Sequence, residues 1–272
     1  MMGFILRSLF FAKKFVIFTL IYVLFSISLF VSFKYYTEFY ADVGPLKNVL
    51  LFTLILASYN IWFSTSILFS AYSSTVIPED IGKEAHYIFL KSVYKSLFRK
   101  YVWYKAITVL AFLTVLGSTS SLLLFVLVSP PIQSFTVGDY ERLLVLFLLL
   151  STVPVASTLA FTSFVPDEKV ALLFTIAIYF FVNVFMGGYY LVKYAANATP
   201  YVLFTLPIYL PTALHDWGEV YAQAKTAYNE VSGVALPYVD YNVILNTLLL
   251  YSIVSIIFMV IGIETNLRRK GN

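Results

Sequence analysis

Few side chains in this sequence could do covalent or metal chemistry. The 272 residues include no cysteine and two histidines, His86 and His215. This excludes thiol catalysis and cysteine-ligated metals, and it argues against a histidine-rich metal site. Gly82-Lys83 is not part of a phosphate-binding P-loop, since position 77, where such a loop needs glycine, is isoleucine. We therefore predict that the chain is not an enzyme and carries no cofactor or metal of its own.

The adjacent carboxylates Asp167 and Glu168 resemble an acid–base pair only at first sight. Neighbouring residues on a helix point about 100° apart, so these two groups do not converge on one proton. Both stand at the start of an apolar stretch, where acidic side chains cap a helix and complement its dipole. We predict the same capping role for the 138–141 segment, which contains Asp139.

Composition indicates the class of protein to which these residues belong. Hydrophobic residues make up 60% and charged residues 12% of the chain, about half the charge of a soluble domain, and the mean hydropathy is +0.85. These values exclude a soluble globular enzyme, a disordered chain and a coiled coil. Six uncharged stretches are long enough to cross a bilayer. They are 15–33, 48–77, 106–128, 143–165, 170–192 and 241–263. The prediction is an all-α integral membrane protein with six transmembrane helices in a single domain, 1–272.

The distribution of basic residues predicts the orientation of these spans. If the N-terminus is inside, five of the 18 lysines and arginines lie outside, and the rest lie inside, as the positive-inside rule requires. The five are Lys34, Lys47, Arg142, Lys193 and Lys225. We therefore expect both termini to be cytoplasmic and the protein to lie in the plasma membrane.

The predicted outer region 193–240 contains an uncharged segment, 195–214, with three prolines. Prolines at this spacing break a helix, so we expect a re-entrant segment or short outer helices rather than a seventh span. Apolar residues from Leu214 to Val231 recur at spacings of three and four, which predicts a one-sided helix. It could pack on the spans, on a second copy or on the re-entrant segment, or act as a structural lid.

An amphipathic helix is predicted inside the cell, between the second and third spans. Pro78, Glu79 and Asp80 form a helix start. Lys91, Lys95 and Arg99 follow at intervals of four and share one face. Two interpretations are open: a helix held by anionic lipid, or a docking surface for a cytosolic partner.

Polar residues inside the spans are the candidates for a transport pathway. Asn60 and Ser64 lie near the middle of the second span, and Asn183 lies near the middle of the fifth. They could line a pathway, or they could only form hydrogen bonds between helices, worth about 0.6 kcal/mol each. The spans contain no carboxylate or histidine that would couple transport to protons. Energy for transport would then come from another subunit.

Several features together suggest a family. A short basic stretch precedes the first span, a tight inner turn lies at 166–169, and a proline-containing outer segment lies at 206–214. The inner segment between spans two and three has an acidic residue, a hydrophobic turn and basic residues in the order Glu84, 88–90, Lys95 or Arg99, and Lys105. In these features, over nearly its whole length, the chain resembles the ABC-2 permeases, the membrane subunits of type-2 ABC exporters.

The resemblance implies a partner and a function. A separate cytosolic ATPase would hold ATP and Mg²⁺, and two permeases would assemble with two ATPases, with no role for nucleic acid. The chain would form the membrane pathway for a hydrophobic or amphipathic substrate. Docking on the ATPase would fall to ten residues: Glu79, Asp80, Glu84, Ile88, Phe89, Lys91, Lys95, Arg99, Asp167 and Glu168. Two alternatives are a permease-like scaffold that acts on a partner at the outer face, and a membrane-embedded enzyme.

Overall fold

The computed structural model describes the chain in twelve parts: residues 9, 13–41, 46–81, 88, 92–93, 97–129, 135–165, 167–181, 203, 206–219, 221–222 and 238–271. Every regular element in these parts is helical. In chain order they are α2 (Lys13–Ala41), α3 (Leu46–Ile81), α5 (Phe98–Val128), α6 (Val137–Thr162), α7 (Glu168–Phe181), the 3₁₀ helix η4 (Leu206–Ala213) and α10 (Tyr241–Gly271).

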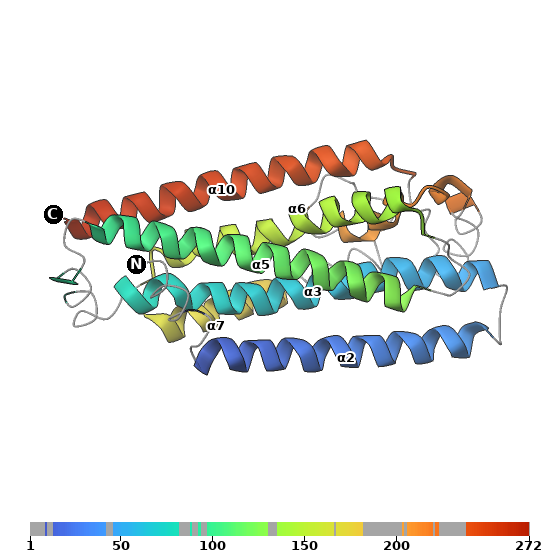
Figure 1. The fold of residues 1–272 in the computed structure, drawn as a ribbon, viewed down its shortest axis with the longest axis horizontal. Coiled ribbons are helices and arrows are strands. Elements are labelled where there is room, and N and C mark those ends of the chain that lie inside the picture. Colours follow the sequence, from blue (N-terminus) through green and yellow to red (C-terminus); the bar gives the residue numbers. More distant parts are fainter. Residues whose placement is uncertain are drawn as a thin grey trace.

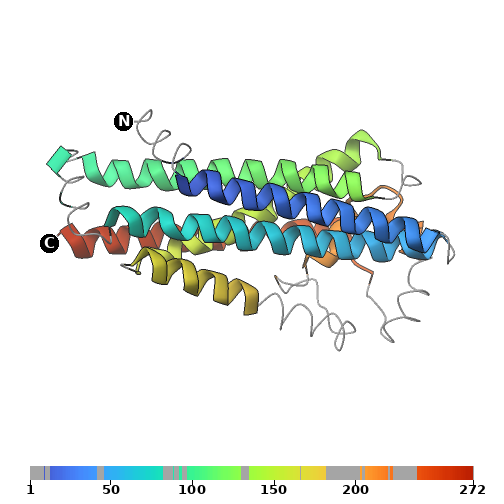
Figure 2. The same ribbon diagram turned by 90° about the horizontal axis from the view of Figure 1, so that it is seen from below.

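The α-helices run back and forth along the long axis of an elongated bundle (Figure 1). The start of α2 and the end of α10 lie at the same end, which we call the termini end (Figure 1). At the opposite end, the far end, α6 and α10 begin and η4 is packed. Helices α2 and α3 run side by side, and α7 lies beside the half of α3 nearer the termini end (Figure 2).

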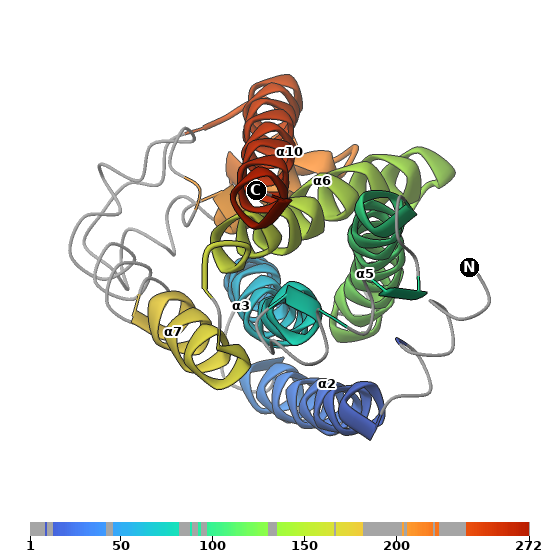
Figure 3. The ribbon, with the colours of Figure 1, turned by 90° about the vertical axis from the view of Figure 1, so that its left-hand side faces the viewer.

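Helix α3 occupies the centre of the bundle. It packs against α2, α5, α6, α7 and η4, and the view from the termini end shows the four α-helices around it (Figure 3). From Ala57 to Pro78 its side chains are almost all buried or half-buried, including Ser58, Ser66 and Ser70, each 0% exposed. Many of these buried side chains are small and carry hydroxyls. The centre of the bundle is therefore weakly polar rather than purely hydrocarbon.

Four of the described helices are long and apolar enough to cross a membrane: Lys13–Tyr35, Phe98–Val128, Val137–Thr162 and Tyr241–Arg268. On α2, Lys34 lies twenty positions after Lys14, which is about 30 Å of helix and matches the hydrocarbon thickness of a bilayer. Between them the helix exposes large apolar side chains such as Leu20 and Leu24. The chain is thus a multi-pass membrane protein, as composition predicted.

The two other predicted spans correspond to α3 and α7. Helix α3 has 36 residues and includes the whole of 48–77, in agreement with a second span that is longer than one crossing. Helix α7 is described from Glu168 to Phe181, which covers only the first part of 170–192. The count of six spans and the orientation of the termini stay predictions.

Two glycines allow helices to approach closely. A Cβ on Gly262 would lie 2.7 Å from the backbone oxygen of Ala160, so α10 and α6 touch backbone to backbone here. A Cβ on Gly117 would lie 2.6 Å from the ring of Phe69 and 2.8 Å from the hydroxyl of Ser151, at the junction of α5, α3 and α6. Small residues at helix crossings are how membrane helices associate, because lipid provides no hydrophobic drive between them.

The described part of the proline-rich segment, which is predicted to lie outside, includes the short 3₁₀ helix η4. All eight residues of η4 are buried, against α3, α6 and α10. This cover is what a non-helical or 3₁₀ backbone needs near a membrane, where no water satisfies its polar groups. Of the predicted apolar helix that follows, Trp217 and Tyr221 are described and buried; its continuation to Val231 lies outside the described residues.

Candidate functional site

Charged side chains from several helices meet at the termini end. Lys14 of α2 pairs with Glu168 of α7 and lies 3.3 Å from the Glu79 carboxylate of α3. One lysine therefore connects three helices. Because Glu79 and Lys14 are each about one-third exposed, water screens this part of the network only partially.

Glu79 has a second basic neighbour on α5. Lys105 is 3% exposed, and its Nζ donates to the backbone oxygen of Val76 at 3.3 Å and lies 3.9 Å from Oε2 of Glu79. A buried lysine is costly unless it is paired and hydrogen-bonded. Here the Val76 carbonyl and the Glu79 carboxylate of α3 are these partners of Lys105. The two contacts hold the start of α5 against the end of α3.

Helix α10 is connected to α5 by a separate set of bonds. Arg99 donates to the two carboxylate oxygens of Glu264 at 3.1 and 2.5 Å, and the ring nitrogen of Trp103 donates to Oε1 of the same carboxylate at 2.7 Å. A two-pronged arginine–carboxylate contact fixes geometry as well as charge. We use the name termini-end network for Lys14, Glu79, Arg99, Trp103, Lys105, Glu168 and Glu264.

The network joins α2, α3, α5, α7 and α10 at one end of the molecule. Helix α3 ends and α5 begins at this same end (Figure 1), and the amphipathic docking helix is predicted in the segment between them. Displacement of that connection would act on Glu79 at one side and on Arg99 at the other. The arrangement therefore links five helices through side-chain contacts at the termini end.

The predicted docking residues fall into four groups. Glu79, Arg99 and Glu168 form ion pairs within the chain. Asp167 accepts the backbone N–H groups of Lys169 and Val170 at 2.7 and 3.1 Å, which confirms its predicted role as a helix cap. Ile88 is exposed. The side chain of Asp80 and the residues Glu84, Phe89, Lys91 and Lys95 lie outside the described part of the structure. Docking on an ATPase remains a prediction.

Two of the three predicted pathway residues, Asn60 and Ser64, lie in the described structure. Ser64 is buried and donates to the backbone oxygen of Asn60 at 2.6 Å, a bond within α3. Asn60 is half-buried, and Asn183 lies outside the described residues.

A polar site between α3, α6 and α7 was not predicted from the sequence. The backbone oxygen of Pro154 accepts from Ser70 at 3.3 Å and from Tyr179 at 3.2 Å, and the Tyr179 hydroxyl lies 2.9 Å from that of Ser157. A cavity of about 220 Å³ adjoins these groups. The signal in the sequence was a proline in the middle of a predicted span, next to hydroxyl residues.

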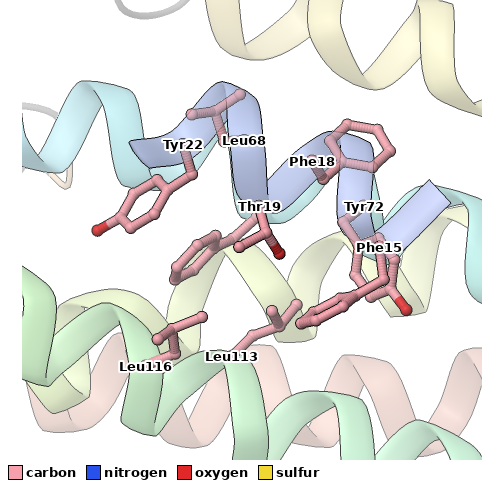
Figure 4. A pocket seen from close by; sticks show the side chains of 9 residues that line it. Phe15, Phe18, Thr19, Tyr22, Leu68, Tyr72, Leu113 and Leu116 are labelled. Atoms are coloured by element: carbon pink, nitrogen blue, oxygen red, sulfur yellow. The ribbon is translucent and has the colours of Figure 1, made fainter. Parts of the chain in front are cut away.

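A second cavity lies between α2, α3 and α5 (Figure 4). Phe15 and Phe18 of α2 pack on Tyr72 of α3 there, and Tyr22 of α2 packs on Phe69. Leu113 and Leu116 of α5 lie on the other side (Figure 4). Its volume is about 20 Å³, close to the space of a single water molecule. It is therefore a small packing gap between aromatic rings, too small for a substrate.

The far end is held by a buried carboxylate. Asp139 is 1% exposed and forms the predicted cap of α6 through a capping box with Thr136. Its two oxygens also receive the backbone N–H of His215 and contact the His215 ring. The Asp139 bond raises the pKa of His215 above its ordinary value, with further help from the charge of Asp216. The cap was predicted, but its histidine partner was not.

No group of three or more acidic or histidine side chains in the described residues could hold a metal ion. Comparison of the chain with protein-family models, with curated proteins and with solved structures finds no match.

Proposed function

We propose that this chain is the permease subunit of an ATP-driven exporter. It would cross the plasma membrane six times, with both termini in the cytoplasm, and form the pathway for a hydrophobic or amphipathic substrate. A separate ATPase subunit would dock at the termini end, and two permeases would assemble with two ATPases.

The observation that supports this proposal is the termini-end network. Arg99 and Glu79 stand on either side of the connection in which the docking helix is predicted, and each is bonded to another helix. A partner that moves this connection would move α2, α5, α7 and α10 with it. Coupling of this kind is what a membrane subunit needs if its energy comes from another protein.

The absence of charge in the predicted spans also supports the proposal that a separate subunit supplies the energy for transport. The six apolar stretches contain no acidic or basic residue, so they offer no carboxylate for coupling to protons. Energy would then enter through the termini end.

The experiment is affinity purification of the tagged full chain from its native membrane in mild detergent, followed by mass spectrometry. A stoichiometric P-loop ATPase is expected. Reversing the charges of Lys91 and Lys95 should abolish its recovery, because both lie on the basic face of the predicted helix. The matched control reverses Lys34 and Lys47 near the far end, and should retain the ATPase. A preparation without an ATPase, also after crosslinking, would overturn the proposal.

A further inference from the structure

Helices α5 and α10 extend past the start of α2 at the termini end (Figures 1 and 2). On α10, Gly262 touches the backbone of Ala160, and α6 ends two residues after Ala160. From position 262, α10 runs on to position 271, about 13 Å further. Helix α5 begins seven residues before Lys105, about 10 Å beyond the contact of Lys105 with Glu79.

We call this projection the stem, and it comprises Phe98–Lys105 of α5 and Glu264–Gly271 of α10. Neither segment belongs to the uncharged stretches that are predicted to cross the bilayer, 106–128 and 241–263. The ion pairs of Glu79 lie at the base of the stem, and such charges are costly in hydrocarbon. The stem therefore stands on the aqueous side of the membrane boundary, at the end that is predicted to be cytoplasmic.

One carboxylate joins the two halves of the stem. Glu264 is the single acidic residue in the stem sequence. It accepts the guanidinium of Arg99 at 2.5 and 3.1 Å and the ring N–H of Trp103 at 2.7 Å, both from α5. The negative charge of the stem is therefore engaged between its own two helices.

Positive charge remains on the outside of the stem. Lys100 and Arg268 are exposed, and the side chain of Arg99 is 65% exposed although it is bonded to Glu264. Arg268 lies one helical turn beyond Glu264, and its charge also acts on that carboxylate. Above Lys105, these three cations and one carboxylate leave a surplus of positive charge, which is complementary to an acidic surface.

An exposed apolar stripe on α5 accompanies these charges. Leu97, Lys100 and Tyr104 are three and four positions apart and so share a face. The exposed fractions of Leu97 and Tyr104 are 45% and 47%. Leu97 lies about 12 Å beyond Lys105, whereas lipid headgroups extend the bilayer by roughly 5–8 Å on each side. Because lipid does not reach Leu97, a protein surface is the better cover for this stripe.

We propose that the stem is a docking surface for an acidic face of the ATPase subunit. Lys100 and Arg268 contact carboxylates of the partner, and Leu97 and Tyr104 pack beside them, as expected for contacts rich in arginine and tyrosine. This inference rests on the function proposed above and deepens it. It adds the end of α10, and a further face of α5, to the docking residues predicted from the sequence.

The test is recovery of the ATPase with the tagged full chain in mild detergent. In the double variant Lys100→Glu, Arg268→Glu, the recovered ATPase should fall at least about ten-fold, because two attractions become two repulsions. Arg99 is left unchanged, since it holds α5 to α10. Melting temperatures equal to that of the wild type show that the variant is folded.

The matched control is Lys13→Glu, Lys34→Glu. Both lysines are exposed on α2, outside the stem, and their reversal changes the net charge by the same amount. This variant should recover as much ATPase as the wild type. An equal loss in both variants would show that the effect is one of net charge, and would overturn the role of the stem.

A second measurement does not depend on charge reversal. Photoreactive p-benzoylphenylalanine in place of Leu97 should crosslink the chain to the ATPase in native membranes, whereas the same group in place of Leu24, an exposed residue of α2, should not. If the ATPase co-purifies but neither this crosslink nor the charge effect is seen, the stem is not the docking surface and the proposed function stands. If the wild type recovers no ATPase, both proposals fail.

Discussion

The backbone N–H of His215 donates to Oδ1 of Asp139 at 2.7 Å, and the ring Nδ1 of the same histidine lies 2.8 Å from Oδ2. The two residues are 76 positions apart, so one buried carboxylate closes a long loop onto the start of α6. Since His215 follows η4 closely in the chain, this contact also fixes the position of η4 under α3 and α10.

Replacing Asp139 with alanine should destabilise the far end. The change leaves the backbone N–H groups of Thr136 and His215 without their acceptor, at a cost of about 1–3 kcal/mol for each donor that stays buried. We expect a lower midpoint of thermal unfolding in detergent. Glu141→Gln, an exposed acid on the same helix, is the control, and an equal effect of both changes would contradict the role of Asp139.

The stability contributed by His215 should depend on pH. The Asp139 bond raises the pKa of His215 above 6.5, so the folded state binds the proton more tightly than the unfolded state. The stabilisation is complete below about pH 6.5 and is lost as the pH rises through the higher folded value. The difference in melting temperature between the wild type and His215→Gln should therefore be largest near pH 5.5 and decrease above pH 7. A difference that increases with pH would show that the pairing is wrong.

The sequence predicted the local features of the far end and missed the distant ones. Asp139 was recognised as a cap because capping depends on residues three positions apart. Its bond to His215 depends on the path of the chain between 140 and 215, which hydrophobic patterns do not determine. The positions of the long helices were predictable for the same local reason, since a run of about 20 apolar residues defines each one.

Contacts between distant residues were also not predictable in the termini-end network. Arg99 was assigned to a docking surface because it continues the spacing of Lys91 and Lys95. In the structure it pairs with Glu264, 165 positions away. A repeat of basic residues at every fourth position identifies a helix face, but not which helix lies opposite that face.

Glu264→Ala should loosen the contact between α5 and α10. It removes the acceptor of Arg99 and Trp103 together, and because Arg99 is largely exposed, we expect a loss of about 1–2 kcal/mol. Exchanging the charges in the double variant Arg99→Glu, Glu264→Arg should recover part of the stability, measured by thermal unfolding. If the double variant regains no stability, the Arg99–Glu264 ion pair contributes little, and the loss in Glu264→Ala comes from the Trp103 hydrogen bond.

Gly262→Val should separate α10 from α6. The first atom of the new side chain would lie 2.7 Å from the backbone oxygen of Ala160, and a backbone atom cannot rotate away as a side chain can. We expect a loss of at least about 1–3 kcal/mol, as for overpacking in a tightly packed interior. Gly138→Ala provides the control, because the nearest atom to its Cβ is 3.8 Å away. Crosslinking between cysteines introduced on α6 and α10 should become less efficient in Gly262→Val alone.

Lys105 provides the last test, because its charge is buried and the structure gives two of its contacts. Lys105→Met keeps the length of the side chain but removes the ammonium group from the Val76 oxygen and from Glu79. Breaking a buried charge contact leaves the remaining partner exposed to an unfavourable environment, so we expect a loss of about 1–3 kcal/mol.

The double variant Lys105→Met, Glu79→Gln separates two explanations for that loss. If the cost comes from a Glu79 charge left without Lys105, neutralising Glu79 should restore part of the stability, so that the two changes are less than additive. Lys14 retains Glu168 in this variant, and α2 therefore stays attached to α7. If instead the two losses add, Lys105 does not act through Glu79, and the contact at 3.9 Å does not couple α5 to α3.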